Sequence, residues 1–416
     1  MHDRVVVTGI GLVTAIGNDR ESTWSAVREG RSGVSRLSGV AGLNDGTMLA
    51  ATVDDPAIGS HELRSLPLAM RAASEAIEDS QVSHYAIQPG RFGCSISATM
   101  GDTPRLHALR TGTDFTHASP FWSTNGEWLP NALCCNLAEE FRLHGPRLCN
   151  STACSTGAIS TLQAVRAIQD NQCDMALTGA VQTIHPLLAS GFKNMRVLAN
   201  HEDPKQACRP FDVNRNGFVM GEGAAMLVLE RLSHAVDRRA PIYAEIVGGR
   251  LCCDAHHITD LNVDSAALSR LIRDTLRTSK LVPADIAYIN AHGTGTLQND
   301  VMETRGIRES FGQAADSVCM SSTKAILGHL VNAAGAVELA ISILALRDGF
   351  APPTVNLTDP DPECDLDCIP FVGRQEQFEH ALKLSIAFGG HLAAIALRRW
   401  SEAGDRSAGK FTRIAA

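Results

Sequence analysis

Short β-rich runs alternate with longer helical runs along most of this 416-residue chain. Strands are predicted where β-branched and other apolar residues cluster, and helices where apolar residues recur every three or four positions. The predicted strands are 4–13, 91–97, 175–181, 225–232, 241–252, 286–290, 382–387 and 393–399, and the predicted helices are 21–28, 67–80, 156–170, 265–279 and 331–347. Such alternation favours a layered α/β architecture in which helices cover sheets.

The alternation is interrupted at residues 238–240, between two parts with a similar order of elements. We therefore expect two similar halves, 1–240 and 241–416, that share one core. Residues 111–128 form the longest irregular stretch. It is rich in Ser, Thr, Pro and aromatic residues, which favours a functional or interface loop over a linker. Residues 401–416 are polar and are predicted to form a loosely ordered tail.

The composition disfavours several classes of protein. The net charge of −8, from 37 basic and 45 acidic residues, argues against a general nucleic-acid-binding protein, which usually carries a basic surface. No run approaches the ~20 apolar residues of a membrane span, and the first residues lack the features of a signal peptide. We expect a cytoplasmic protein whose twelve cysteines are reduced thiols.

Cys154 stands in an unusual setting, because small residues flank it throughout segment 151–157, just before a predicted helix. Small neighbours let the backbone turn tightly and let a substrate approach the sulfur. The positive end of a helix dipole lowers the pKa of a nearby thiol and favours the thiolate, the nucleophile that thioester exchange requires. A buried, inert cysteine beside a helix cap is the alternative, and the partners of Cys154 decide between the two.

Two histidines stand where catalytic groups often lie. His292 follows the predicted strand 286–290 and is flanked by Gly and Thr, which places it to reach into a cleft. His329 precedes a predicted helix, with Lys324 nearby and Glu338 on that helix, where the two charges are able to pair. Because no Asp, Glu or Cys cluster at ligand spacing accompanies the histidines, paired proton or carbonyl donors are favoured over a metal site.

Together these segments resemble the β-ketoacyl-acyl-carrier-protein synthases of the type II elongating kind, within the thiolase superfamily. The nucleophile motif T-A-C-S/T-x-G matches Thr152–Gly157, and the motif N-A-H-G-T-x-T matches Asn290–Thr296. The motif S-x-K-x-x-x-G-H-x-x-x-A-A-G-x-x-E matches 322–338. The remaining matches are residues 5–11, 209–212, 217–224, 300–303 and 388–390, so the resemblance covers nearly the whole chain in the expected order.

The resemblance implies a five-layered αβαβα thiolase-like fold of two similar halves, the first carrying a nucleophilic cysteine and the second a catalytic histidine pair. It also implies a homodimer. Its substrates are acyl and malonyl thioesters held on the phosphopantetheine of an acyl carrier protein, and no metal or other cofactor is implied.

The resemblance also implies a role for each catalytic residue. Cys154 would accept the acyl group as a thioester. His292 and His329 would donate hydrogen bonds to the malonyl thioester carbonyl and stabilise the enolate formed as CO2 leaves. The backbone N–H groups of Cys154 and Phe388 would form the oxyanion hole, and Phe388 would also gate the acyl pocket. Lys324 and Glu338 would set the charge balance around His329.

Further residues are expected to hold the substrate. By the resemblance, Thr259, Thr294 and Thr296 would hydrogen-bond the pantetheine amides, although threonines beside glycine also serve simply to stabilise turns. Phe218, in the mid-chain signature, is expected to line the substrate site. Ala118 stands where the family often has a larger aliphatic residue, which predicts a roomier pocket for a longer or unusual acyl chain.

Docking of an acidic carrier protein requires basic residues at the mouth of the tunnel. Lys205 and Arg209 fall near the docking region of the family, and Arg64 and Arg71 fall in a second region. The alternative is that all four are ordinary solvated surface charges.

One departure and one alternative follow from the same comparison. After 388–390 this chain has His391 and Leu392 where the family usually has Thr and Asn, which bears on the geometry of the oxyanion loop. A non-catalytic chain-length-type partner subunit of a heterodimeric synthase shares this fold and is the alternative function. Such subunits usually lack the nucleophile, whereas Cys154 and both histidines are present here. A CoA-using thiolase is disfavoured because no cysteine stands at the C-terminal glycine turn.

Overall fold

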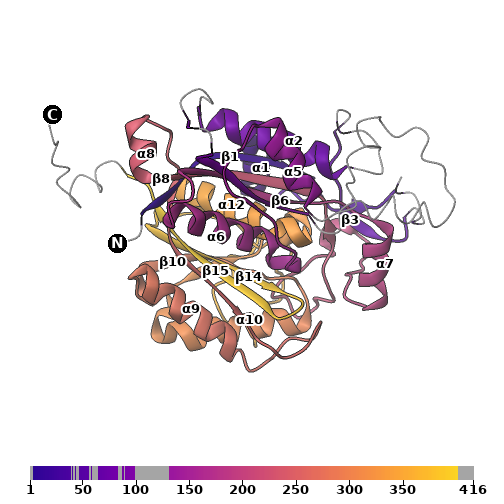
Figure 1. The fold of residues 1–416 in the computed structure, drawn as a ribbon. Coiled ribbons are helices and arrows are strands. Elements are labelled where there is room, and N and C mark those ends of the chain that lie inside the picture. Colours follow the sequence, from indigo (N-terminus) through magenta and orange to yellow (C-terminus); the bar gives the residue numbers. More distant parts are fainter. Residues whose placement is uncertain are drawn as a thin grey trace.

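The computed structural model describes residues 3–401, except 39, 41–42, 44–45, 56–57, 59–63, 83–86, 89 and 99–130. Within these residues, helices and sheets alternate in five layers (Figure 1). This confirms the predicted αβαβα architecture. The predicted loop at 111–128 and the tail beyond residue 401 lie outside the described residues.

The first sheet is built from strands of the first half of the chain, in the order β1–β8–β6–β4–β5. Successive side chains of a strand point to opposite faces. In β8, Leu227 and Leu229 enter the core between the two sheets, whereas Met226 and Val228 enter the outer core. Because both faces are covered, these strands are nearly continuous apolar runs. The strands are β1 (Val5–Thr14), β4 (Phe92–Ser97), β5 (Arg147–Leu148), β6 (Met175–Gln182) and β8 (Gly223–Arg231).

The second sheet has the order β9–β15–β14–β10–β11. In β15, Ile395 and Leu397 face the middle layer, and Ala394 and Ala396 face the second outer layer. The sheets join where β9 pairs with the start of β1 over Val5–Val7. The strands are β9 (Ala244–Cys253), β10 (Ile286–Asn290), β11 (Cys319–Ser321), β14 (His380–Ala387) and β15 (His391–Arg399).

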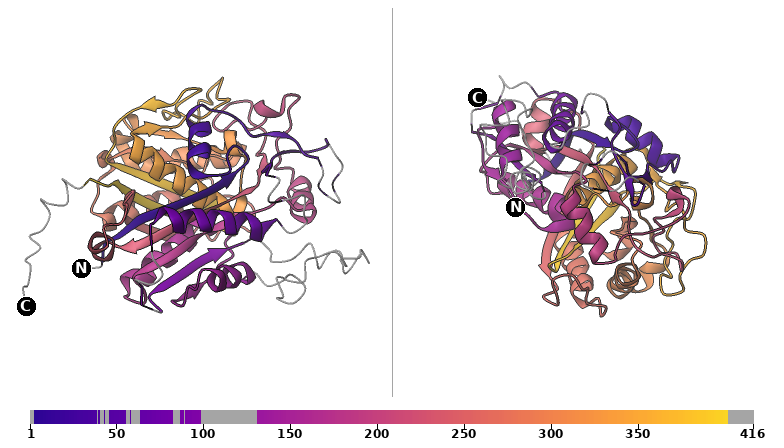
Figure 2. Two further views of the ribbon diagram at one scale, coloured as in Figure 1. Left: turned by 90° about the horizontal axis from the view of Figure 1, so that it is seen from above. Right: turned by 90° about the vertical axis from the view of Figure 1, so that its right-hand side faces the viewer.

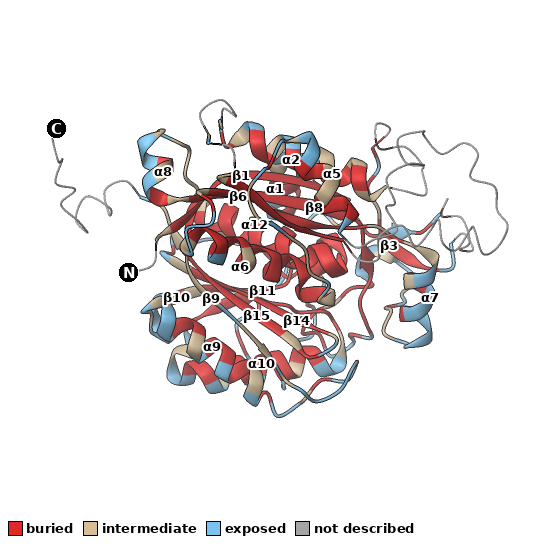
Figure 3. Cartoon of the chain, in the orientation of Figure 1, coloured by how far each residue is buried: buried red, intermediate tan, exposed pale blue. Residues whose placement is uncertain are grey.

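Helices form the other three layers. One outer layer packs on the first sheet, one on the second, and a buried pair fills the space between them (Figure 2). Every residue of α12 from Ala334 to Leu346 is buried, as expected for a helix that is apolar on all sides (Figure 3). The outer helices are α2 (Ser65–Asp79) and α5 (Ala132–Glu140) on one side and α9 (Ala266–Ser279) and α10 (Leu297–Phe311) on the other, with α6 (Thr156–Gln169) and α12 (Ala334–Asp348) between the sheets.

The two middle helices approach each other closely at their first turns. A Cβ atom on Gly157 of α6 would lie 2.5 Å from the backbone nitrogen of Ala336, and one on Gly335 of α12 would lie 2.6 Å from that of Ala158. Real Cβ contacts are longer, so glycine is required at both positions. This contact places the segment before α6 beside the segment before α12, and these two segments carry Cys154 and His329.

The predicted elements all appear, and their ends differ from the prediction by at most three residues. The predicted helix 331–347 begins as a 3-10 turn, Val331–Ala333, before α12. Among the described residues, no helix is long and apolar enough to cross a bilayer. The remaining elements are α1 (Arg20–Arg28), α7 (Pro186–Asn194), α8 (Leu232–Asp237), α11 (Lys324–Leu327), β2 (Ser35–Arg36), β3 (Leu49–Ala51), β7 (Met220–Gly221), β12 (Phe350–Ala351) and β13 (Arg374–Gln375).

Candidate active site

A small cavity of ≈ 40 Å³ collects side chains from segments far apart in the sequence. It lies where the turn before α6, the end of β10, the turn before α12 and the end of β14 meet. The described residues that line it are Cys154, Phe192, Phe218, Leu261, His292, Thr294, Thr296, Asn299, His329, Ile386, Ala387 and Phe388. The fold thus brings together the predicted nucleophile, both predicted histidines and the predicted oxyanion residue.

Cys154 lies in a tight, strained turn. It belongs to the 3-10 turn Ala153–Ser155 that precedes α6. Ala153 has a φ of +47°, a left-handed conformation that is uncommon for a residue other than glycine. The backbone N–H groups of Cys154 and Phe388 both act on the Cys154 sulfur and lower the pKa of its thiol, against the larger effect of burial. Two N–H donors that converge on one point are the geometry of an oxyanion hole.

The thiolate that the sequence predicts for Cys154 is not the resting form in the structure. Burial raises the pKa of the Cys154 thiol to about 12, although the positive charge of Lys324 acts in the opposite direction. Cys154 is only 7% exposed, and desolvation disfavours the charged form. Burial therefore outweighs the positive end of the helix dipole, and Cys154 is a neutral thiol at neutral pH.

His329 presents an N–H group to the cavity. Its Nε2 lies 3.1 Å from Cys154 Sγ, and its Nδ1 accepts a hydrogen bond of 3.2 Å from the Val331 backbone N–H. A neutral imidazole carries its proton on one nitrogen only, so the proton of His329 lies on Nε2. The ring of Phe218 packs edge-on against the imidazole, with centroids 5.0 Å apart.

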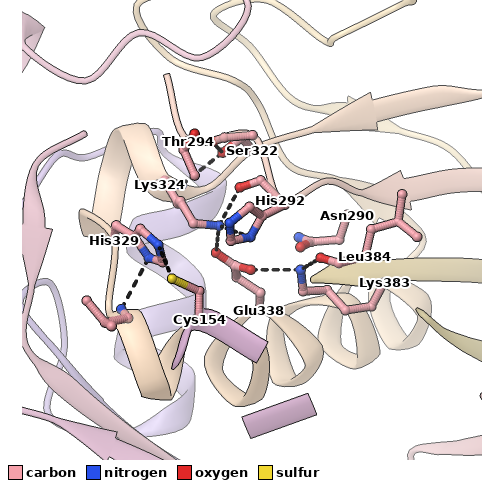
Figure 4. Close-up of polar contacts among 12 residues, drawn as sticks. Cys154, Asn290, His292, Thr294, Ser322, Lys324, His329, Glu338, Lys383 and Leu384 are labelled. Atoms are coloured by element: carbon pink, nitrogen blue, oxygen red, sulfur yellow. Dashed lines mark hydrogen bonds and ion pairs between the residues drawn. The ribbon is translucent and has the colours of Figure 1, made fainter. Parts of the chain in front are cut away.

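His292 has the same tautomer for a different reason. Lys324 Nζ lies 3.4 Å from its Nδ1 and also donates to its backbone carbonyl. Because an ammonium group only donates, Nδ1 is the acceptor and the proton lies on Nε2. The pKa of each imidazole lies well below its usual range, because burial and the charge of Lys324 disfavour protonation. The two rings, with centroids 5.4 Å apart, are therefore a pair of neutral N–H donors (Figure 4).

Lys324 and Glu338 form a buried ion pair, as predicted, with 2.5 Å between Nζ and Oε1. After burial, the charge of Lys324 is the largest cause that lowers the pKa of His329, which fits the expected effect of this pair on that histidine. The hydrogen bonds of Lys324 go to His292 rather than to His329, because α11 places the ammonium behind the end of β10.

Two acidic residues hold the loop that carries His292. Glu303 accepts hydrogen bonds from the backbone N–H groups of His292 and Gly293, at 2.6 and 2.7 Å. Asp300 accepts from the backbone N–H groups of Phe211 and Gly295, at 2.8 and 3.2 Å. Asp300 and Glu303 lie three positions apart, on one face of α10. The sequence motif contained them, but only the structure assigns them this positioning role.

Two family models together match most of the chain, as far as residue 358. The model described as "Beta-ketoacyl synthase, N-terminal domain" matches residues 2–235, and "Beta-ketoacyl synthase, C-terminal domain" matches residues 243–358. This chain belongs to the beta-ketoacyl synthase family. It is accordingly a condensing acyltransferase.

Curated relatives and solved structures agree with this assignment. A 3-oxoacyl-[acyl-carrier-protein] synthase 2 of Coxiella burnetii is 37% identical over 95% of this chain and 98% of the relative. The tetracenomycin polyketide synthase ketoacyl synthase alpha subunit of Streptomyces glaucescens is 35% identical over 96% and 98%. A type II PKS acyl-carrier protein in complex with its ketosynthase bound to the hexaketide gives a TM-score of 0.87, at 30% identity, over 96% of this chain and 100% of that chain.

The unusual residues after the glycine turn of this synthase leave the oxyanion donor in place. The Gly389 N–H donates to the Ile258 carbonyl at 2.7 Å, and the His391 carbonyl accepts from Ser155 Oγ at 3.0 Å. These bonds fix the loop on both sides of the turn, so the Phe388 N–H still points to the nucleophile.

The predicted substrate residues divide into three groups. Thr294, Thr296 and Phe218 line the cavity, and the two threonine hydroxyls lie 2.9 Å apart. Thr259 does not line it, and its N–H is bonded to His257 Nδ1 at 3.2 Å. Ala118 lies outside the described residues. Several cavity residues were not predicted, namely Phe192, Leu261, Asn299, Ile386 and Ala387.

The four basic residues proposed for docking also differ in their surroundings. Arg64 is bonded to the buried carboxylate of Glu222 at 2.6 Å, and Arg71 is paired with Asp55. These two charges are already engaged within the chain. Lys205 is exposed, and Arg209 is half-buried, bonded at 2.7 Å to the Gln206 carbonyl.

The side chains of Cys154, His292 and His329 are close enough to hold a metal ion. The ligand atoms of Cys154, His292 and His329 all lie within 4.8 Å of one another. A metal ion would require Nε2 of both histidines to be unprotonated, against the hydrogen bonds made at each Nδ1.

Proposed function

We propose that this synthase transfers an acyl group from an acyl carrier protein to Cys154 and condenses it with a malonyl unit held on an acyl carrier protein. The observation that carries this proposal is the convergence of one thiol, two neutral imidazole N–H donors and two backbone N–H donors in one cavity. Each group matches one requirement of a decarboxylative Claisen condensation.

The first step is a thioester exchange. The Cys154 sulfur attacks the acyl carbonyl, the carrier thiol leaves, and the cysteine proton passes to that leaving thiolate. The tetrahedral oxyanion accepts hydrogen bonds from the backbone N–H groups of Cys154 and Phe388. One such donor typically contributes about 3 kcal/mol to the transition state.

The second step creates the carbon nucleophile. The bond between the malonyl carboxylate and its α-carbon breaks, and the electron pair moves into the thioester carbonyl to form an enolate. His292 and His329 donate their Nε2–H groups to the enolate oxygen. Two donors in a cavity shielded from water stabilise that charge more than water would.

The third step joins the two acyl units. The enolate carbon attacks the acyl carbonyl on Cys154, and the tetrahedral intermediate expels the cysteine thiolate, which takes a proton from solvent. The net reaction consumes an acyl thioester, a malonyl thioester and one proton. It yields a β-ketoacyl thioester, CO2 and a free carrier thiol. Thr294 and Thr296 would hold the pantetheine arm, Phe388 would gate the pocket, and no metal or organic cofactor takes part.

We further propose that the enzyme works as a cytoplasmic homodimer of chains with halves 1–240 and 241–416. All twelve cysteines are free thiols, which fits a reducing compartment. The first sheet ends at β5, and no other strand of the described residues covers its outer edge. An uncovered edge of this kind is suited to pairing with another chain.

Intact-mass spectrometry tests the acyl-transfer step. The native protein is incubated with acyl-carrier proteins of several chain lengths, beside Cys154→Ala and the matched control Cys173→Ala, which removes a buried thiol outside the cavity. We expect the acyl mass on the native and Cys173→Ala proteins and none on Cys154→Ala. No acylation at any chain length would favour the chain-length-type partner subunit instead.

A further inference from the structure

A second buried lysine lies behind the histidine pair and has no place in the mechanism above. Lys383 is on β14, where its neighbours Leu382 and Leu384 face the second outer layer and Lys383 itself faces the middle layer. Its side chain is fully buried, and its Nζ lies 2.8 Å from Glu338 Oε2 and donates to the Leu384 carbonyl (Figure 4). A buried charge is costly unless it is paired, so the pairing calls for a functional explanation.

One carboxylate holds both buried lysines. Glu338 binds Lys324 through Oε1 at 2.5 Å and Lys383 through Oε2 at 2.8 Å. Lys324 in turn donates to His292. Lys383 therefore fixes the carboxylate that orients the ammonium group behind His292.

Lys383 brings a second buried cation to the carboxylate of Glu338. Glu303 accepts two backbone N–H bonds beside His292, but burial raises the pKa of its carboxyl to about 7. Glu338 is therefore the carboxylate that both lysines share. Without Lys383, Glu338 would lose one of its two cations directly behind the place where the enolate forms, and charges interact strongly in a dry interior.

We propose that Lys383 is a positioning residue for the decarboxylation step. It acts through Glu338 and Lys324, and so holds in place the ammonium group that bonds Nδ1 of His292 and leaves its Nε2–H group free to donate. This inference rests on the proposed function, because it assumes that an enolate forms beside His292 and His329.

The surrounding groups define the sign of the expected pH effect. Three charged groups face Lys383: Glu338 from α12, Lys324 from α11 and Glu303 from α10. The charge of Lys383 lowers the pKa of both His292 and His329. Its removal therefore raises the pKa of the imidazoles and moves the acid limb of the reaction to higher pH.

The test is the pH–rate profile for CO2 release from malonyl-carrier protein. It compares the native enzyme, Lys383→Met, Lys383→Arg and the matched control Lys280→Met, which changes an exposed lysine at the end of α9. We expect Lys383→Met to slow decarboxylation about tenfold or more at neutral pH. We also expect the acid limb of its pH–rate profile to move to higher pH. Acyl transfer to Cys154 is expected to change only a few-fold. Lys383→Arg is expected to restore most of the rate, and Lys280→Met to match the native enzyme.

Two results would overturn the inference. One is that Lys383→Met releases CO2 at the native rate, with the acid limb of its pH–rate profile at the native pH. The other is an equal loss of rate in Lys383→Met and Lys383→Arg with no movement of the limb, because a residue that only packs the core would behave in this way. If Lys383→Met does not fold, Lys383→Gln replaces it under the same criteria.

A native enzyme that releases no CO2 would instead count against the proposed function. In that case NMR titration of ¹⁵N-histidine decides the charge effect alone, with the His292 signal assigned by its loss in His292→Gln. A higher pKa of His292 in Lys383→Met supports the inference, and an unchanged pKa overturns it.

Discussion

The Nε2 atom of His329 lies 3.1 Å from the Sγ atom of Cys154, although 175 positions separate the two residues in the sequence. The contact depends on α6 and α12, which cross so closely at Gly157 and Gly335 that a side chain at either position would collide with the other helix. The chemistry of the site thus depends directly on the packing of the middle layer.

The first prediction concerns this packing. Gly157→Ala is expected to lower the free energy of unfolding by about 1–3 kcal/mol, the usual cost of overpacking a core, and to reduce acylation of Cys154. Chemical denaturation and intact-mass spectrometry measure the two effects. Gly191→Ala on α7 is the control, because a Cβ atom there meets nothing within 4 Å and alanine favours a helix. Native stability and acylation in Gly157→Ala would contradict the packing argument.

The second prediction concerns the two histidines. His292→Ala is expected to slow CO2 release from malonyl-carrier protein by about 10²–10³-fold, since one preformed donor to the enolate is lost. Acyl transfer to Cys154 should persist, because the oxyanion donors of that step are backbone N–H groups. Single-turnover assays of each half-reaction separate the effects. Equal losses in both half-reactions would mean that His292 also acts on the thiol.

The third prediction concerns the protonation of the nucleophile. With a pKa of about 12, the thiolate fraction of Cys154 grows about tenfold for each pH unit below that value. The rate of alkylation of Cys154 by iodoacetamide should therefore rise steadily from pH 7 to pH 10, whereas the rate for a free cysteine peptide levels off near its pKa of about 8.5. A plateau in the alkylation rate of Cys154 below pH 9 would mean that its thiol ionises near neutral pH, as predicted from the helix terminus.

The fourth prediction concerns carrier-protein docking. Lys205→Glu and Arg209→Glu are expected to raise KM for acyl-carrier protein several-fold, with little change for a small acyl thioester that lacks the protein, because rim charges act mainly on encounter. Arg64→Met is expected instead to cost about 3–5 kcal/mol of stability, since it leaves the buried carboxylate of Glu222 unpaired. An equal effect of the Lys205 and Arg209 variants on both substrates would exclude docking at this surface.

Much of this account could be predicted from the sequence, for identifiable reasons. The strands β6 and β10 are apolar runs bounded by turn residues, and Cys154, His292 and His329 stand in local motifs at the ends of such elements. The pairing of Lys324 with Glu338 was also predictable, because the two residues flank one turn. The division of the chain near residue 240 stays a prediction.

Other features depend on contacts between distant segments, which a linear reading does not reveal. Lys383 interrupts an apolar strand and carries no local sign that Glu338 lies opposite. The pKa of Cys154 depends on burial by three other segments rather than on the helix that follows. Arg64 pairs with Glu222, which lies 158 positions away, so the sequence alone does not show that the charge of Arg64 is already paired.

The most direct test of the central claim is a complete turnover. The malonyl-carrier protein is labelled with ¹³C at the carbon that is lost as CO2. It is incubated with acyl-carrier protein and either the native enzyme or Cys154→Ala, and the masses of the carrier-bound products are measured by mass spectrometry. We expect a β-ketoacyl carrier without the label, with labelled CO2 released, for the native enzyme only. A β-ketoacyl product formed equally by Cys154→Ala, or no product from native enzyme that has been acylated on Cys154, would contradict it.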